Sequence, residues 1–178
     1  MEEDEGTYDS MPKRPAWPPQ HLAGFDTFIR EMNKELNTAT GRGLVMVACN
    51  YIDELLLKIL KSFMIQGESA AQLLDGFNAP LGTLSTRAAA AHALGLINDA
   101  EHREITILRR VRNRFAHKVN VSFDDQDIDN LTSHLTMVIP DCHPQGRYSS
   151  SSAALILGLT NRAAYVSRKR RSYEGWPY

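Results

Sequence analysis

One segment limits the folds open to this chain more than any other, because from Leu44 to Met64 apolar residues recur at steps of three and four. Such steps place side chains on one face of an α-helix. The apolar stripe is wide, which is typical of a helix covered by neighbours on several sides. It comprises Leu44, Val47, Ala48, Tyr51, Ile52, Leu55, Leu56, Ile59, Leu60 and Phe63. We therefore expect this helix to be the central and most buried one.

Other segments with the same periodicity predict helices around it. They run from His21 to about Asn37, through the alanine-rich stretch to Leu94, from about Asp99 to His117, and from Ser122 or Asp124 to Pro140. Ser85 or Thr83 is the expected cap of the alanine-rich helix, and Asp99 that of the helix after it. A sixth helix fits Ala153–Val166. No period-two pattern indicates a strand, so the predicted fold class is all-α, a single bundle of five to six helices.

The domain organisation follows from shifts in composition. Residues 1–20, acidic and rich in proline, predict a disordered N-terminal leader. Residues 21–142 are the expected bundle domain. Residues 143–178 hold a serine-rich stretch, expected as a flexible connection over 143–152, then the sixth helix and a disordered basic C-terminal tail.

Charge and composition exclude several classes of protein. The formal net charge of −1 gives no global case for nucleic-acid binding. Two cysteines are too few for a disulfide framework, and no apolar run reaches the roughly 18 residues of a membrane span. The N-terminus lacks a secretory pattern. We expect a cytoplasmic protein with no membrane association, no cofactor and no metal, since no histidine or cysteine pair has zinc spacing.

The motif from Arg112 to His117 is the strongest candidate for chemistry, because it joins a guanidinium to a titratable imidazole near a predicted helix end. At about 100° per residue, positions five apart differ by about 140°, so these two side chains would not share a face of a regular helix. Arg109, Asn113 and His117, at steps of four, would share one.

The central part of the chain resembles the mannitol repressor family of bacterial helical regulators. The resemblance rests on Leu73-Leu74-Asp75-Gly76, on Pro80-Leu81-Gly82-Thr83-Leu84-Ser85-Thr86-Arg87 and on Ala93-Leu94-Gly95-Leu96-Ile97-Asn98, and it covers roughly Arg42 to Pro140. It implies an all-α homodimer that regulates through a protein partner, since the family lacks an evident DNA-reading motif.

The Arg112–His117 motif also resembles the Arg-x4-His motif of HEPN domains, which include metal-independent ribonucleases that dimerise. That resemblance implies a catalytic site with RNA as substrate, in which His117 transfers a proton and Arg112 stabilises charge on the phosphate. Asn113 would orient the imidazole or the substrate. In the structural alternative, Arg112 pairs with Asp53 or Glu54, and His117 lies at the negative end of its helix.

Further binding candidates are basic. Arg87 follows a predicted helix start and could hold an anion, although an arginine there is more often salt-bridged. Arg109 belongs to the polar stripe. The run Arg168, Lys169, Arg170 and Arg171 could contact nucleic-acid phosphates or an acidic partner, or lie free in solvent. The leading hypothesis is a regulatory or adaptor protein of the mannitol repressor type; the alternative is a HEPN-like endoribonuclease.

Overall fold

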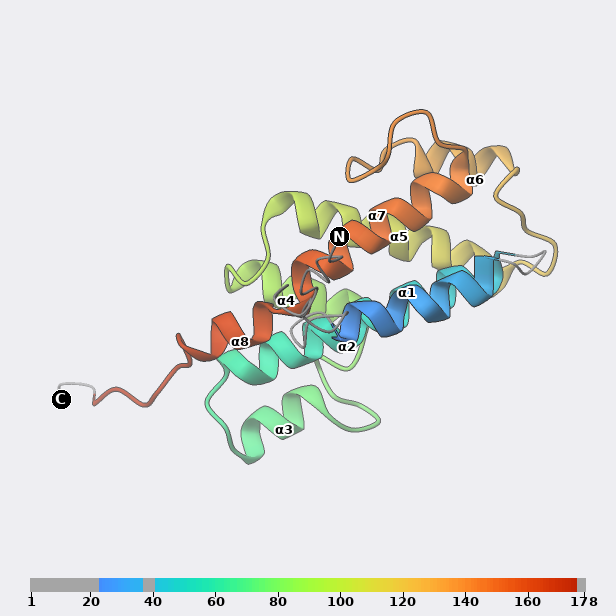
Figure 1. Cartoon of the computed structure of the whole chain (residues 1–178). Coiled ribbons are helices and arrows are strands. Elements are labelled where there is room, and N and C mark those ends of the chain that lie inside the picture. Colours follow the sequence, from blue (N-terminus) through green and yellow to red (C-terminus); the bar gives the residue numbers. More distant parts are fainter. Residues whose placement is uncertain (1–22, 37–40, 176–178) are drawn as a thin grey trace, which may run out of the picture.

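The computed structural model describes residues 23–36 and 41–175, which form helices and connecting loops only, so the predicted all-α fold class is confirmed (Figure 1). The expected leader lies outside the described residues. The helices are α1 (Ala23–Leu36), α2 (Arg42–Phe63), α3 (Glu68–Leu74), α4 (Leu84–Ala93), α5 (Asp99–His117), α6 (Gln126–Thr132), α7 (Pro144–Thr160) and α8 (Arg162–Ser167). Within this part of the chain, no helix is both long and apolar enough to cross a membrane.

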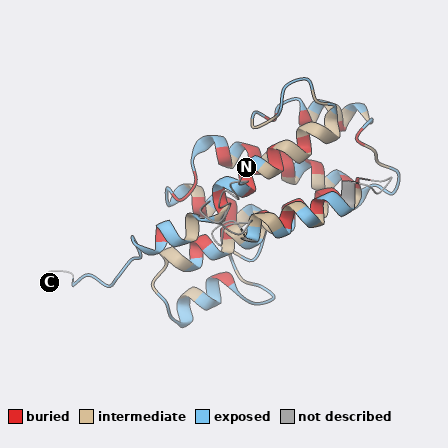
Figure 2. Cartoon of the chain, viewed as in Figure 1, coloured by how far each residue is buried: buried red, intermediate tan, exposed pale blue. Residues whose placement is uncertain are grey.

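Helix α2 is the centre of the bundle, as its apolar stripe predicts. It packs against α1, α4, α5, α7 and α8, and the buried residues of the molecule gather where these helices face one another (Figure 2). Its own contribution to the core is Leu44, Val45, Ala48, Cys49, Ile52, Leu56, Ile59 and Leu60. Burying so many aliphatic side chains is the main source of stability in a helical domain.

The starts of α4 and α5 are fixed by two capping boxes. Thr83 caps α4, one of the two predicted choices, and exchanges hydrogen bonds with Thr86. The predicted cap Asp99 is wrong, because the N-cap of α5 is Asn98. A capping box needs an acceptor three residues after the cap. Asn98 has Glu101 there, and the two residues exchange backbone-to-side-chain bonds of 2.9 Å.

Helix α6 is shorter than its apolar pattern predicts. It begins after Asp125 and ends at Thr132, whereas the pattern continues to Val138. The cause is Glu104, a fully buried carboxylate of α5. It accepts hydrogen bonds from the backbone N–H groups of Thr136 and Met137 at 2.9–3.2 Å and from the Thr136 hydroxyl. These bonds hold the chain in an irregular path over α5.

The predicted flexible connection over residues 143–152 is wrong, since this stretch is the first half of α7. Tyr148, Ser151 and Ser152 are completely buried there. Serine hydroxyls can bond carbonyls one turn back in a helix. Ser152 does so to the carbonyl of Tyr148 at 2.7 Å, and Ser151 donates to Glu104 at 2.7 Å. The serine run is therefore compatible with a buried helix.

Candidate protein-contact surface on α5

The polar residues of the predicted motif lie off the buried face of helix α5: Arg112 and Asn113 are half-buried, and His117 is exposed. Its apolar face, which includes Ile105, Leu108, Val111 and Phe115, is buried against the bundle. The C-terminal end is held by Arg42 of α2. Its guanidinium donates to the carbonyls of Phe115 at 2.5 Å and of Lys118 and Val119 at 2.9 Å. These bonds satisfy carbonyls that a helix end leaves without partners, so α5 stays helical through His117.

Two hollows border this side of α5. The arginine hollow, of about 480 Å³, lies between α5, α2 and the start of α4. Its lining residues are Cys49, Asn50, Asp53, Gly82, Thr83, Leu84, Ser85, Arg109, Arg112 and Asn113. The sequence analysis did not single out Asn50, and it considered Asp53 only as a possible partner of Arg112. The central helix also carries Arg42, Glu54, Lys58 and Lys61, so the polar character of Asn50 and Asp53 did not by itself distinguish them.

The second, the His117 hollow, has a volume of about 570 Å³. It is lined by Arg109, Arg110, Asn113, Arg114, His117, Lys118 and Leu131. Arg109, Asn113 and His117 thus share one side of α5, as the four-residue steps predict. Arg112 lines the arginine hollow but not the His117 hollow. The regular helix therefore keeps Arg112 apart from His117.

The pairing predicted for Arg112 is not made. Asp53 accepts instead from Arg87 at 2.6 Å, while Arg112 donates to the side-chain oxygen of Asn113 at 3.3 Å. Among the described residues, no carboxylate lies within 4.0 Å of the guanidinium of Arg109 or Arg112. The positive charge of the arginine hollow is therefore not neutralised by close ion pairs.

An acidic side chain balances the positive charge at the C-terminal end of α5. Asp127 of α6 lies 3.0 Å from the Lys118 ammonium and 3.8 Å from the Arg114 guanidinium. The hydrogen bond from Lys118 holds the pKa of Asp127 below its ordinary value. Among the arginines that line the two hollows, Arg109, Arg110 and Arg112 thus have no close ion pair, whereas Arg114 has one.

Arg87 lies inside the fold. It is 9% exposed and donates to Asp53, to the carbonyl of Leu81 at 2.9 Å and to that of Leu74 at 3.3 Å. These acceptors account for its charge without a bound anion. Arg87 therefore ties the loop before α4 to α2, which is the salt-bridged alternative of the sequence analysis.

The basic run after α8 returns to the C-terminal end of α2. The Arg170 side chain donates to the carbonyl of Ser62 at 3.1 Å, and the backbone N–H of Arg171 to that of Phe63 at 3.0 Å. The Arg171 guanidinium also lies 5.9 Å from the Phe63 ring centre, and that of Arg168 lies 5.4 Å from the Tyr165 ring. Cations are favoured at the negative end of a helix. Arg170 and Arg171 therefore have structural contacts, although all four basic side chains are exposed.

The cysteine in the wall of the arginine hollow is not a reactive nucleophile. Burial raises the pKa of the Cys49 thiol to about 11, so the group stays protonated near neutral pH. Its sulfur lies 3.5 Å from the hydroxyl of the fully buried Tyr148. What the surface offers is a set of fixed positive charges and carboxamides, suited to binding an anionic partner.

Comparison with known proteins gives one informative match. No family model matches the chain, and no curated protein matches it. A solved structure does, the X-ray structure of the MtlR–HPr complex from Escherichia coli, in which the MtlR chain aligns with a TM-score of 0.56 and 23% sequence identity. The alignment covers 82% of this chain and 99% of that chain. The chain therefore has the fold of MtlR.

Proposed function

We propose that this protein is a regulator of the mannitol repressor type that acts by binding another protein. The observation that carries the proposal is the shared fold with MtlR, which was solved in complex with HPr. The Pro-Leu-Gly-Thr-Leu-Ser-Thr-Arg stretch supports it independently, because it resembles the same family. The partner we propose is an HPr-like protein, and the site of action is the cytoplasm.

We place the contact on the side of α5 that carries Arg109, Arg112 and Asn113. Arginine is enriched in protein interfaces, and unpaired guanidiniums there favour a partner surface with carboxylates or another anionic group. A regulator of this kind needs no catalytic group of its own. Arg112 and His117, which a ribonuclease would need in one cleft, line different hollows, so we do not propose RNA cleavage. The homodimer stays a prediction.

Binding to HPr tests this proposal. Isothermal titration of the purified protein with HPr from the source organism should show saturable binding. Reversing two charges, with Arg109→Glu and Arg112→Glu together, should weaken it at least about 100-fold, since close charge pairs across interfaces contribute several kcal/mol.

The matched control is Lys58→Glu, which reverses one exposed charge on α2 away from both hollows. It should leave the affinity within about threefold of the wild type. Circular dichroism checks that each variant is folded. A folded wild type that does not bind HPr would overturn the proposal, and equal weakening by the control would move the contact away from α5.

A further inference from the structure

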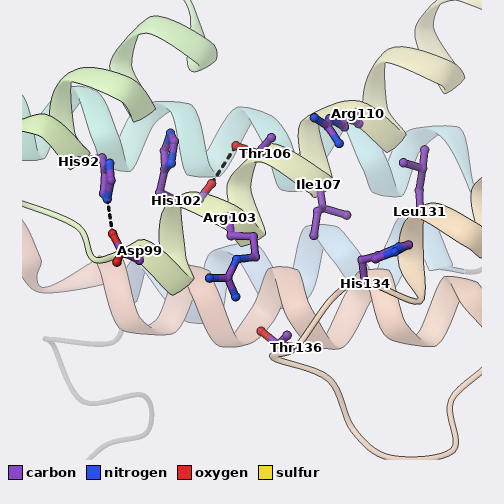
Figure 3. Close-up of a pocket in the computed structure, with 10 residues that line it drawn as sticks. All are labelled: His92, Asp99, His102, Arg103, Thr106, Ile107, Arg110, Leu131, His134 and Thr136. Atoms are coloured by element: carbon purple, nitrogen blue, oxygen red, sulfur yellow. Dashed lines mark hydrogen bonds and ion pairs between the residues drawn. The ribbon is translucent and has the colours of Figure 1, made fainter.

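A third hollow, on another side of α5, gathers three of the six histidines of the chain (Figure 3). Its volume is about 620 Å³, within the range of small-molecule sites. The lining comes from the end of α4, from α5, from α6 and from the segment after it. It consists of His92, Asp99, His102, Arg103, Thr106, Ile107, Arg110, Leu131, His134 and Thr136. We call it the histidine hollow.

The three histidines differ in their hydrogen bonds. His92 and His102 stack with ring centres 4.5 Å apart, and Nε2 of His92 lies 2.7 Å from the Asp99 carboxylate. His134 bonds through Nδ1 to the carbonyl of Asn130 at 2.7 Å. A carbonyl only accepts, so Nδ1 is the donor. The other nitrogen of that ring becomes a second donor only when the ring is protonated.

The arginines supply fixed charge. Arg103 and Arg110 are seven residues apart, two turns of α5, and so lie on the same face of the helix. No ion pair involves either of them in the part of the chain that the structure describes. The carboxylate in the lining is Asp99, which pairs with His92. Glu104, nearby on α5, is fully buried and engaged by Thr136, Met137 and Ser151.

The hydroxyls of the hollow are already engaged. Thr106 donates to the carbonyl of His102 at 2.9 Å, and Thr136 donates to Glu104 at 3.1 Å. The donors left for a ligand are therefore guanidinium and imidazole groups. Ile107 and Leu131 add apolar surface. No group of histidine, cysteine, aspartate or glutamate side chains in residues 23–36 and 41–175 is arranged to hold a metal ion.

We propose that the histidine hollow binds a phosphorylated small molecule. A phosphate monoester carries nearly two negative charges near neutral pH and offers three acceptor oxygens. That matches two guanidiniums without carboxylate partners and imidazoles that gain donors on protonation. The organic part of the ligand packs on Ile107 and Leu131. This site does not depend on the proposed partner, so the chain can bind HPr whether or not it binds a phosphate ester.

Titration calorimetry with glucose 6-phosphate, glucose and inorganic phosphate tests the site. Glucose 6-phosphate should bind saturably and glucose should not; inorganic phosphate should bind more weakly, because it lacks the apolar contacts. Arg103→Gln and Arg110→Gln should each weaken binding at least about tenfold, as expected for loss of a charge-assisted hydrogen bond. Arg114→Gln, an exposed arginine outside the histidine hollow, is the matched control and should change affinity less than about twofold.

Sulfate tests the histidines, because its own charge does not change between about pH 6 and pH 8, so any pH dependence of its binding reports on groups of the protein. The groups that face the site are His92 from α4, Asp99, His102, Arg103 and Arg110 from α5, and His134 from the segment after α6. Protonation adds positive charge, so sulfate should bind more tightly at about pH 6 than at about pH 8. Sulfate binding that does not change with pH would contradict the part assigned to the histidines. Absence of saturable glucose 6-phosphate binding, or equal weakening by Arg114→Gln, would overturn the site.

Discussion

At the scale of single residues, buried hydrogen bonds of charged side chains join segments that are distant in sequence. Arg87 links α4 to α2 through Asp53, to the preceding loop through the carbonyl of Leu81 and to the end of α3 through the carbonyl of Leu74. Glu104 does the same between α5, α7 and the segment after α6. Removing one partner leaves the other buried and unpaired, which costs more than the bond itself contributes.

Arg87→Ala should therefore lower the free energy of unfolding by about 2–4 kcal/mol, a range reduced for the partial exposure of Asp53. Urea unfolding followed by circular dichroism measures it. The control is Lys61→Ala, which removes an ion pair with Asp75 whose side chains are 47% and 49% exposed. That change should cost less than about 1 kcal/mol. A smaller loss for Arg87→Ala than for Lys61→Ala would contradict the structural role of Arg87.

The buried Cys49–Tyr148 pair predicts a loss of stability at alkaline pH. Burial raises the pKa of the Cys49 thiol from 9.0 to about 11, and it raises the pKa of Tyr148 as well. A group whose pKa is raised by folding stabilises the native state fully below its unfolded pKa. That stability is lost as pH rises through the folded value. For Cys49 the loss is about 3 kcal/mol between roughly pH 9 and pH 11, at 1.36 kcal/mol per unit.

Urea unfolding at a series of pH values checks this. The Cys49→Ala variant removes the thiol and should show a shallower decline over the same range, whatever its stability at neutral pH. Equal declines in the wild type and the variant would show that Cys49 contributes nothing to the alkaline transition.

At the scale of helices, the two glycines before α2 and after α4 offer a matched comparison. Gly41 and Gly95 both have positive φ, +59° and +68°. A Cβ on Gly41 would lie 2.7 Å from the Phe123 ring, whereas one on Gly95 would meet nothing within 4 Å. Gly95→Ala should cost about 1–2 kcal/mol for backbone strain alone. Gly41→Ala should cost about 2–4 kcal/mol, because overpacking adds to the strain.

Thermal unfolding of both variants shows which substitution costs more stability. A larger loss for Gly95→Ala than for Gly41→Ala would contradict the packing of Phe123 on the start of α2.

Helix periodicity predicted the long helices because their stability comes from an apolar face that the sequence displays directly. It missed α3, whose seven residues are too short for a period to show. It misjudged the first half of α7 because four adjacent serines look like a linker. An apolar face of the helix was nevertheless visible in the sequence, since its residues recur at steps of seven, one and three: Tyr148, Leu155, Ile156 and Leu159. The early end of α6 was not predictable locally, because Glu104 imposes it from another helix.

At the scale of the whole molecule, the sequence predicted the candidate site only in part. Helix geometry alone predicts that Arg109, Asn113 and His117 share one side of α5. It also predicts that Arg112 lies apart from His117. The pairing of Arg87 with Asp53 and the role of Arg42 at the end of α5 do not, because those partners lie 34 and 73 residues apart along the chain. Only the packed bundle decides which charges are paired inside it and which remain for a partner.

The central claim is that this MtlR-like fold binds a protein through α5. Its most direct test is a titration of isotope-labelled protein with HPr from the source organism, followed by the backbone amide signals in nuclear magnetic resonance. We expect the largest shifts at Arg109 to Asn113 and at the bordering segment from Gly82 to Ser85. Shifts confined to other helices, or no shifts at saturating HPr, would contradict the account.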